Sequence, residues 1–158
     1  MERHVENARQ VAQFLRADRR VAWVDYAGFR DSPYNGLARK YLGGRAPSLF
    51  TFGVTGDLEA AKAFYDALKL VKRLVNIGDT RSLCCHPAST THRQMTPEEQ
   101  RRAGVRPETI RLSIGIEHVE DIIEDLDQAL SKASLAARRR ESCERSDPRA
   151  HSTGGLAS

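Results

Sequence analysis

The sequence predicts an α+β fold, in which a mostly antiparallel sheet carries helices packed on one face. Four or five short segments are rich in β-forming residues, and segments with helical spacing of apolar residues separate them. The segment Thr109–Glu117 alternates cleanly between apolar and polar or small residues, as a half-buried strand does. The second face of the sheet is therefore expected to be solvated or covered by another domain.

The first half of the chain contains two helical and two extended segments. Apolar residues recur at helical spacing in Arg3–Ala17, and Val21–Tyr26 is rich in β-formers. A short helix is expected at Asn35–Leu42, with Asn35 as its N-cap. The strand expected next is Ser48–Val54.

The middle of the chain begins with a helix that opens at Asp57, whose charge suits the positive end of the helix dipole. Two short extended pieces, Leu74–Gly78 and Ser82–His86, are expected to follow it. A loop then leads to Thr96–Glu99, where Thr-Pro-Glu-Glu predicts a helix start with a capping box.

The last expected helix carries apolar residues from Val119 to Leu130, and the pattern dissolves after Ala133. We therefore divide the chain into a linker helix (1–17), one α+β domain (18–133) and a disordered basic tail (134–158). The tail holds five arginines against three acidic residues, within a net charge of +4. A solvated tail is favoured over a nucleic-acid contact, because the domain itself shows no basic stripe.

The composition is that of an ordinary globular chain, with 158 residues, 40% hydrophobic and 29% charged. No run approaches the roughly 18 apolar residues of a membrane helix, and the N-terminus is neither a signal nor a transit peptide. A cytoplasmic location without a membrane partner is expected. Cys84, Cys85 and Cys143 show no CxxC spacing, which favours reduced thiols that act as small hydrophobes.

Arg111 is the strongest candidate for a binding residue. It lies in the middle of an expected strand, and Ser113 and Gly115 on its own face leave room above the guanidinium. That planar fork of donors could hold a carboxylate through two hydrogen bonds, although an arginine on a wet sheet face is the alternative. Ser82 could bind an anion where an extended segment resumes, or it could be a turn residue.

The segment Ser89–His92 places three hydroxyls beside an imidazole. Thr90, Thr91 and His92 are candidates for the wall of a polar site, and a hydrogen-bonded loop is the alternative. His86 and His92 have no carboxylate at ligand spacing, so a metal site is rejected.

Five segments carry a family resemblance in the family's own order: MERHVENARQVAQFL, SPYNGLARKYL, SLFTFGVTGDLEAAKAFYDALKL, NIGDTRSLCCHPASTTHRQM and TIRLSIGIEHVEDIIEDLDQAL. Together they resemble the Cys/Met metabolism family of pyridoxal-phosphate enzymes, in particular its O-acetylhomoserine sulfhydrylase branch. The resemblance covers about residues 1 to 133 and implies the C-terminal small domain of a fold-type I enzyme. Such relatives are typically homotetramers.

The resemblance implies a transferase that converts O-acetylhomoserine and sulfide to homocysteine and acetate. Pyridoxal phosphate would be its electron sink. Arg111 matches the arginine that binds the substrate carboxylate in such enzymes, and Ser82 matches a serine of the same site. Thr90, Thr91 and His92 would form a wall near it.

One departure from the family concerns the lysine that carries the cofactor. That lysine lies in a Ser-x-Thr-Lys segment of the family's large domain, and no lysine here has this context. The chain therefore resembles a fragment that has no catalytic residue of its own and is inactive alone. A non-catalytic module that docks on a large domain is the alternative, as is cystathionine γ-synthase or lyase activity in the intact enzyme.

Overall fold

The computed structural model describes residues 1–146, with side chains up to Arg140. The expected tail from residue 147 onward lies outside the described residues. The helices are α1 (Glu2–Ala17), α2 (Asn35–Tyr41), α3 (Leu58–Ala67), α4 (Pro97–Arg102) and α5 (Val119–Ser146), with a 3-10 turn at Pro87–Ser89. The strands are β1 (Val21–Asp25), β2 (Leu49–Val54), β3 (Lys72–Arg73), β4 (Leu83–Cys85) and β5 (Thr109–Ser113).

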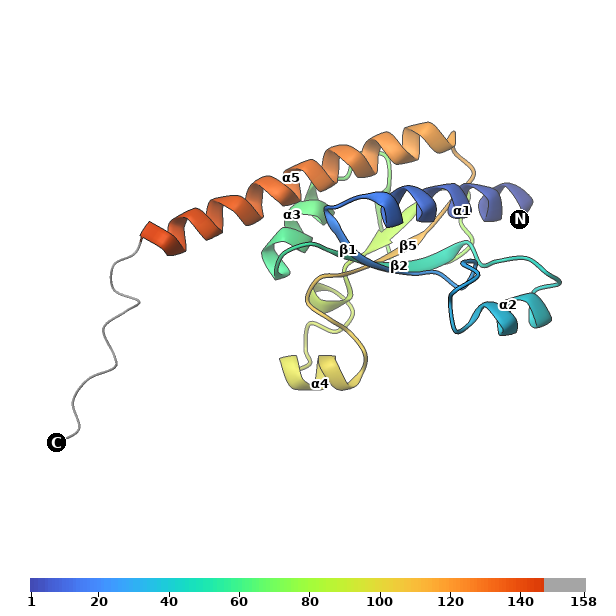
Figure 1. Ribbon diagram of the computed structural model, residues 1–158, viewed down its shortest axis with the longest axis horizontal. Helices are drawn as coiled ribbons and strands as arrows, with labels where there is room; N and C mark the ends of the chain where they lie inside the picture. The colour runs from blue at the N-terminus through green and yellow to red at the C-terminus, as the bar shows by residue number, and fades with distance from the viewer. Residues whose placement is uncertain (147–158) are drawn as a thin grey trace.

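The five strands form one sheet in the order β1-β2-β5-β4-β3. The pairs β1/β2, β2/β5 and β5/β4 are antiparallel, and β4/β3 is parallel. The long helices α1 and α5 cross one side of this sheet together with α3, whereas the short helices α2 and α4 lie on the other side (Figure 1). The predicted α+β class with a mostly antiparallel sheet is confirmed.

The core lies between the sheet and the three covering helices. Alternation along β5 sends Ile110, Leu112 and the following Ile114 into this core, where each is fully buried. Phe52 of β2 meets Phe64 of α3 edge to face, with ring centroids 5.5 Å apart. The odd-numbered residues of β5 consequently point to the open face of the sheet.

Two helix starts follow the local rules that predicted them. The side chain of Asp57 accepts hydrogen bonds from the backbone N–H groups of Glu59 and Ala60, and it caps α3. Thr96 and Glu99 form a complete capping box at the start of α4. Asn35, however, is not the N-cap of α2; Tyr34 holds that position, and the Asn35 amide instead donates to the Ala27 carbonyl at 3.0 Å.

The short extended piece expected at Leu74–Gly78 does not form a strand. The strand in this region is the two-residue β3, and Leu74, Val75 and Ile77 are 50–59% exposed. Apolar residues predict burial, but no element in the described part of the chain covers this segment.

The expected end of the last helix at Ala133 is also wrong, since α5 continues to Ser146. Residues 134–141 are mostly alanine, leucine, arginine and glutamate, which are strong helix formers. The added turns also pack on the domain: Arg140 Nη1 lies 2.5 Å from Asp57 Oδ2, at the start of α3.

Candidate functional site

Arg111 projects from the middle of β5 on the open face of the sheet. The strand register pairs it with Thr51 on one side and with Cys85 on the other, and Thr51 pairs in turn with Asp25. The four residues thus form a row across the sheet. The Arg111 side chain is half-buried, and among the described residues its only hydrogen bond joins Nη2 to the carbonyl oxygen of Asn76, at 3.4 Å.

A pocket of about 770 Å³ opens on this face. Its lining includes Arg111, Thr51, Asp25, Trp23, Arg106 and His92. Trp23 packs against Gly53, where a β-carbon would lie 2.2 Å from the indole nitrogen, so the close approach of Trp23 requires glycine at that position. The guanidinium of Arg106 stacks 5.4 Å above the Trp23 ring.

Two of the three arginines that line the pocket already have a partner within the chain. Arg16, which also lines it, is paired with Asp31 at 2.6 Å, and Arg106 lies over Trp23. Arg111 therefore offers the guanidinium that has room for a new anionic partner. Two parallel N–H groups in one plane match the two oxygens of a carboxylate.

Ser82 does not lie in this pocket. The register pairs Leu83 with Ser113, so strand alternation places Ser82 on the helix-covered face and Arg111 on the open face. Ser82 is fully buried; its hydroxyl donates to Glu117 Oε2 at 2.9 Å and accepts from the Gly115 N–H at 2.9 Å. The expected proximity of Ser82 and Arg111 is thus not met, and Asn76 takes the place beside the arginine.

Within the segment Thr90–His92, only His92 lines the pocket. Thr91 Oγ1 and His92 Nδ1 form a hydrogen bond of 2.8 Å, so Thr91 can orient the imidazole. The Thr90 hydroxyl instead donates to the carbonyl oxygen of His86 at 2.7 Å, and it closes the loop. Of the three residues of the predicted wall, His92 therefore lines the pocket, whereas Thr90 and Thr91 belong to the loop that supports it.

Burial shifts two neighbouring titratable groups toward their neutral forms. Desolvation lowers the pKa of His86, whose ring nitrogens contact Ser89 Oγ and the Pro107 carbonyl oxygen. Desolvation also raises the pKa of the Cys84 thiol well above its ordinary value. Both groups belong to the packed interior, as expected for a buried reduced thiol.

Sequence reasoning missed Asn76, Trp23 and Glu117. Asn76 contacts Arg111 through its backbone carbonyl, which any residue type could supply, so the sequence contains no signal for it. Trp23 could have been found from its place on the polar face of a strand. Glu117 was part of the recognised strand pattern, but its contact with Ser82 spans 35 residues.

The fold and the pocket define an α+β domain that presents a half-buried arginine, Arg111, from the open face of its sheet. A family model for Cys/Met metabolism PLP-dependent enzymes matches residues 1–131, and this chain belongs to that family. It is 52% identical over 130 residues to O-acetyl-L-homoserine sulfhydrylase 1 of Thermus thermophilus, covering 82% of this chain and 31% of the relative. Identity to the O-acetyl-L-homoserine sulfhydrylase of Corynebacterium glutamicum is 49% over 131 residues, covering 80% and 29%.

A solved structure shares the fold. The crystal structure of a putative O-acetylhomoserine (thiol)-lyase from Campylobacter jejuni, which contains N'-pyridoxyl-lysine-5'-monophosphate, matches with a TM-score of 0.75 and 40% sequence identity. The match covers 82% of this chain and 31% of that chain. The present chain therefore spans somewhat less than a third of the length of these relatives.

The residues of this chain do not fit pyridoxal phosphate by themselves. The cofactor of this family is held on a lysine, and none of the five lysines here lines the Arg111 pocket. Lys62 and Lys132 face a separate groove between α3 and α5. No cofactor step is therefore assigned to residues of this chain.

Proposed function

We propose that this chain is the substrate-carboxylate-binding part of an O-acetylhomoserine sulfhydrylase-like enzyme. The observation that carries the proposal is the half-buried guanidinium of Arg111, which lies in a pocket and makes one long hydrogen bond within the part of the chain that the structure describes. Its other N–H groups can bind the α-carboxylate of an amino acid through paired, charge-assisted hydrogen bonds. The transfer itself, in which sulfide replaces acetate on the substrate, needs groups that this chain does not supply.

The setting of the intact enzyme is part of the same proposal. The buried free thiols of Cys84 and Cys85 suit a reducing compartment, so we place the enzyme in the cytoplasm. None of the helices in the described part of the chain combines the length and the apolar character that a bilayer span requires. A homotetramer is the expected assembly of the intact enzyme, by resemblance to the family.

The test joins this chain to the large domain of the Thermus thermophilus relative. Replacing Arg111 by alanine should weaken substrate binding by about 2–3 kcal/mol, which raises KM for O-acetylhomoserine on the order of 30- to 150-fold. Arg111→Lys keeps the charge but loses the planar fork, so it should recover only part of this. Arg139→Ala, on the exposed side of α5, is the matched control.

An unchanged KM in Arg111→Ala would contradict the carboxylate assignment. The same joined enzyme decides the nucleophile, because sulfide and cysteine can be assayed side by side. Turnover with cysteine alone would point to cystathionine γ-synthase type activity instead of sulfhydrylase activity.

A second candidate function is a non-catalytic module that docks on a large domain. The exposed apolar segment Leu74–Ile77 favours it, because single domains rarely leave several adjacent aliphatic side chains in water. Size-exclusion chromatography of this chain with the same large domain, supplied as a separate polypeptide, tests it. Co-elution without restored turnover supports the module, and separate elution contradicts it.

A further inference from the structure

One segment, residues 76–82, connects the Arg111 pocket to a half-buried carboxylate, that of Glu117, on the other side of β5. At its first residue, the Asn76 carbonyl accepts the hydrogen bond from Arg111. At its last residue, Ser82 donates two hydrogen bonds to the carboxylate of Glu117. The position of the Asn76 carbonyl therefore depends on what holds the segment in place.

Glu117 holds Ser82 with both of its carboxylate oxygens. Oε1 accepts from the Ser82 backbone N–H at 2.6 Å, and Oε2 accepts from the Ser82 hydroxyl at 2.9 Å. The same hydroxyl accepts from the Gly115 N–H, so one serine joins the segment to the end of β5. Hydrogen bonds to an ionised carboxylate are stronger than those between neutral groups.

Gly115 provides the space for this contact. A β-carbon there would lie 2.3 Å from the Thr80 carbonyl oxygen and 2.4 Å from Glu117 Oε2. The Ile116 N–H also donates to the Thr80 carbonyl at 2.9 Å, so the segment is anchored at a second residue. The chain thus packs the segment, the glycine and the carboxylate against one another.

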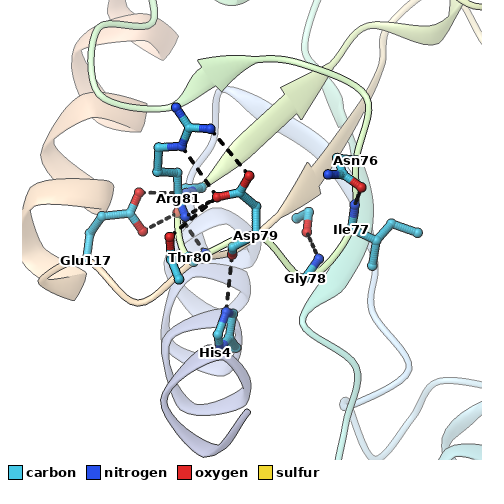
Figure 2. Close-up of polar contacts among 11 residues, drawn as sticks. His4, Asn76, Ile77, Gly78, Asp79, Thr80, Arg81 and Glu117 are labelled. Atoms are coloured by element: carbon cyan, nitrogen blue, oxygen red, sulfur yellow. Dashed lines mark hydrogen bonds and ion pairs between the residues drawn. The ribbon is translucent and has the colours of Figure 1, made fainter.

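Helix α1 supports the same region from the covered face. The Asn7 amide donates to the carbonyl oxygens of Gly115 and Glu117, at 3.1 and 2.9 Å. His4 Nε2 contacts the Asp79 carbonyl oxygen at 3.2 Å (Figure 2). Within the segment, the Arg81 N–H and side chain hold the pKa of Asp79 below its usual value.

We propose that Glu117 is a positioning residue for the substrate arginine. It fixes Ser82, the fixed segment presents the Asn76 carbonyl, and that carbonyl orients the Arg111 guanidinium toward the pocket. Glu117 itself lies outside the pocket lining and does not contact the substrate. This inference rests on the proposed role of Arg111 as the carboxylate-binding group.

The first test uses this chain alone. Glu117→Gln keeps the size of the side chain but removes its charge and one of its two acceptors. Amide hydrogen exchange at Ser82 and Gly115 should become at least about tenfold faster, while exchange in the β1/β2 pair stays unchanged. Glu124→Gln, at an exposed carboxylate on α5, is the control and should leave all of these rates unchanged. Unchanged exchange at Ser82 in Glu117→Gln would overturn the proposal.

The second test uses the joined enzyme, because a positioning role of Glu117 predicts a change in KM that a purely structural role does not. Glu117→Gln should raise KM for O-acetylhomoserine about tenfold with kcat within about twofold, because a misaligned guanidinium weakens substrate binding. A normal KM in Glu117→Gln beside a raised KM in Arg111→Ala overturns the positioning role alone. A normal KM in both variants overturns the proposed function, and the positioning role with it.

Discussion

Three polar side chains differ in how far their hydrogen-bonding groups find partners within the described part of the chain. The guanidinium of Arg111 keeps free donors at a pocket, which suits a binding role. The buried carboxylate of Asp125 accepts from the backbone N–H groups of Lys69, Leu70 and Val71, so its hydrogen bonds are structural. The hydroxyl of Tyr26 is buried and has no partner among the described residues.

The unpartnered hydroxyl predicts a stabilising substitution at Tyr26. Burial without a hydrogen bond costs free energy, and Tyr26→Phe keeps the edge-on contacts with the rings of Phe29 and Phe50. Tyr26→Phe should raise the free energy of unfolding by about 1 kcal/mol, measured by urea denaturation at pH 7. A loss of stability would show that the hydroxyl has a partner after all.

The buried Tyr26 also predicts that the free energy of unfolding depends on pH in the alkaline range. Burial raises the pKa of Tyr26 from 10.0 to about 12, so the folded state retains the phenol proton at pH values where the unfolded chain has released it. The free energy of unfolding therefore does not depend on the ionisation of Tyr26 below pH 10, and it falls as the pH rises from 10 toward 12. Tyr26→Phe should flatten this decline in a urea series between these pH values, and an equally steep decline would contradict the assignment.

At the scale of elements, the start of α3 and the end of α5 are joined through Asp57. Its carboxylate caps α3 and pairs with Arg140. The backbone N–H of Ala60, followed by the charge of Arg140, holds the pKa of Asp57 below its ordinary 3.8. The stabilisation is therefore present above pH 3.8 and is lost as the pH falls through the lower, folded-state pKa.

Variants at Asp57 separate the cap from the charge. Asp57→Ala should cost about 1 kcal/mol at pH 7, because α3 loses its N-cap. Asp57→Asn keeps a capping side chain, so it should cost less and should weaken the acid dependence of stability. Thermal unfolding at pH 7 and at pH 3 measures both effects, and equal losses in the two variants at pH 7 would argue against the capping role.

The extension of α5 predicts a stability contribution from residues beyond the family match. A chain that ends at Ala133 should be less stable than one that ends at Ser146, by about 1–2 kcal/mol. The shorter chain loses the ion pair between Arg140 and Asp57, and it loses the packing of Ala137 near Gly56. Equal urea midpoints for the two chains would show that the extension packs without stabilising.

At the scale of the whole molecule, α1, α3 and α5 cover one face of the sheet, and the short helices α2 and α4 lie on the other side (Figure 1). The Arg111 pocket opens on that second side. The exposed segment Leu74–Ile77 lies next to β3, at one edge of this sheet. The chain spans 31% of its Thermus thermophilus relative, so much of the length of such an enzyme lies in other residues. An open pocket and an exposed apolar segment are the kinds of surface that a larger domain would cover.

This arrangement predicts association of the isolated chain through its apolar edge. Sedimentation velocity should show self-association that increases with concentration, because exposed aliphatic side chains favour burial. Ile77→Asp should reduce it without lowering the unfolding midpoint, since Ile77 is 59% exposed. Leu135→Asp, at a similarly exposed position on α5, is the control, and an equal effect of both changes would contradict a specific edge.

The sequence alone determined what depends on local chemistry. The capping box at Thr96, the N-cap at Asp57 and the alternation along β5 each involve residues within a few positions of one another. The sequence also placed Arg111 on the polar face of its strand. In each case, hydrogen bonds and side-chain direction follow from the backbone of one element.

Only the tertiary structure decided which distant residues meet. Cys84 and Cys85 are chemically alike, so the sequence could not show which one faces the core, and the face of Ser82 stayed undetermined with them. The pairing of Leu83 with Ser113 settles this, and it places Ser82 beside Glu117 and leaves Asn76 beside Arg111. Strand register and loop packing depend on contacts more than 30 residues apart, which no local pattern encodes.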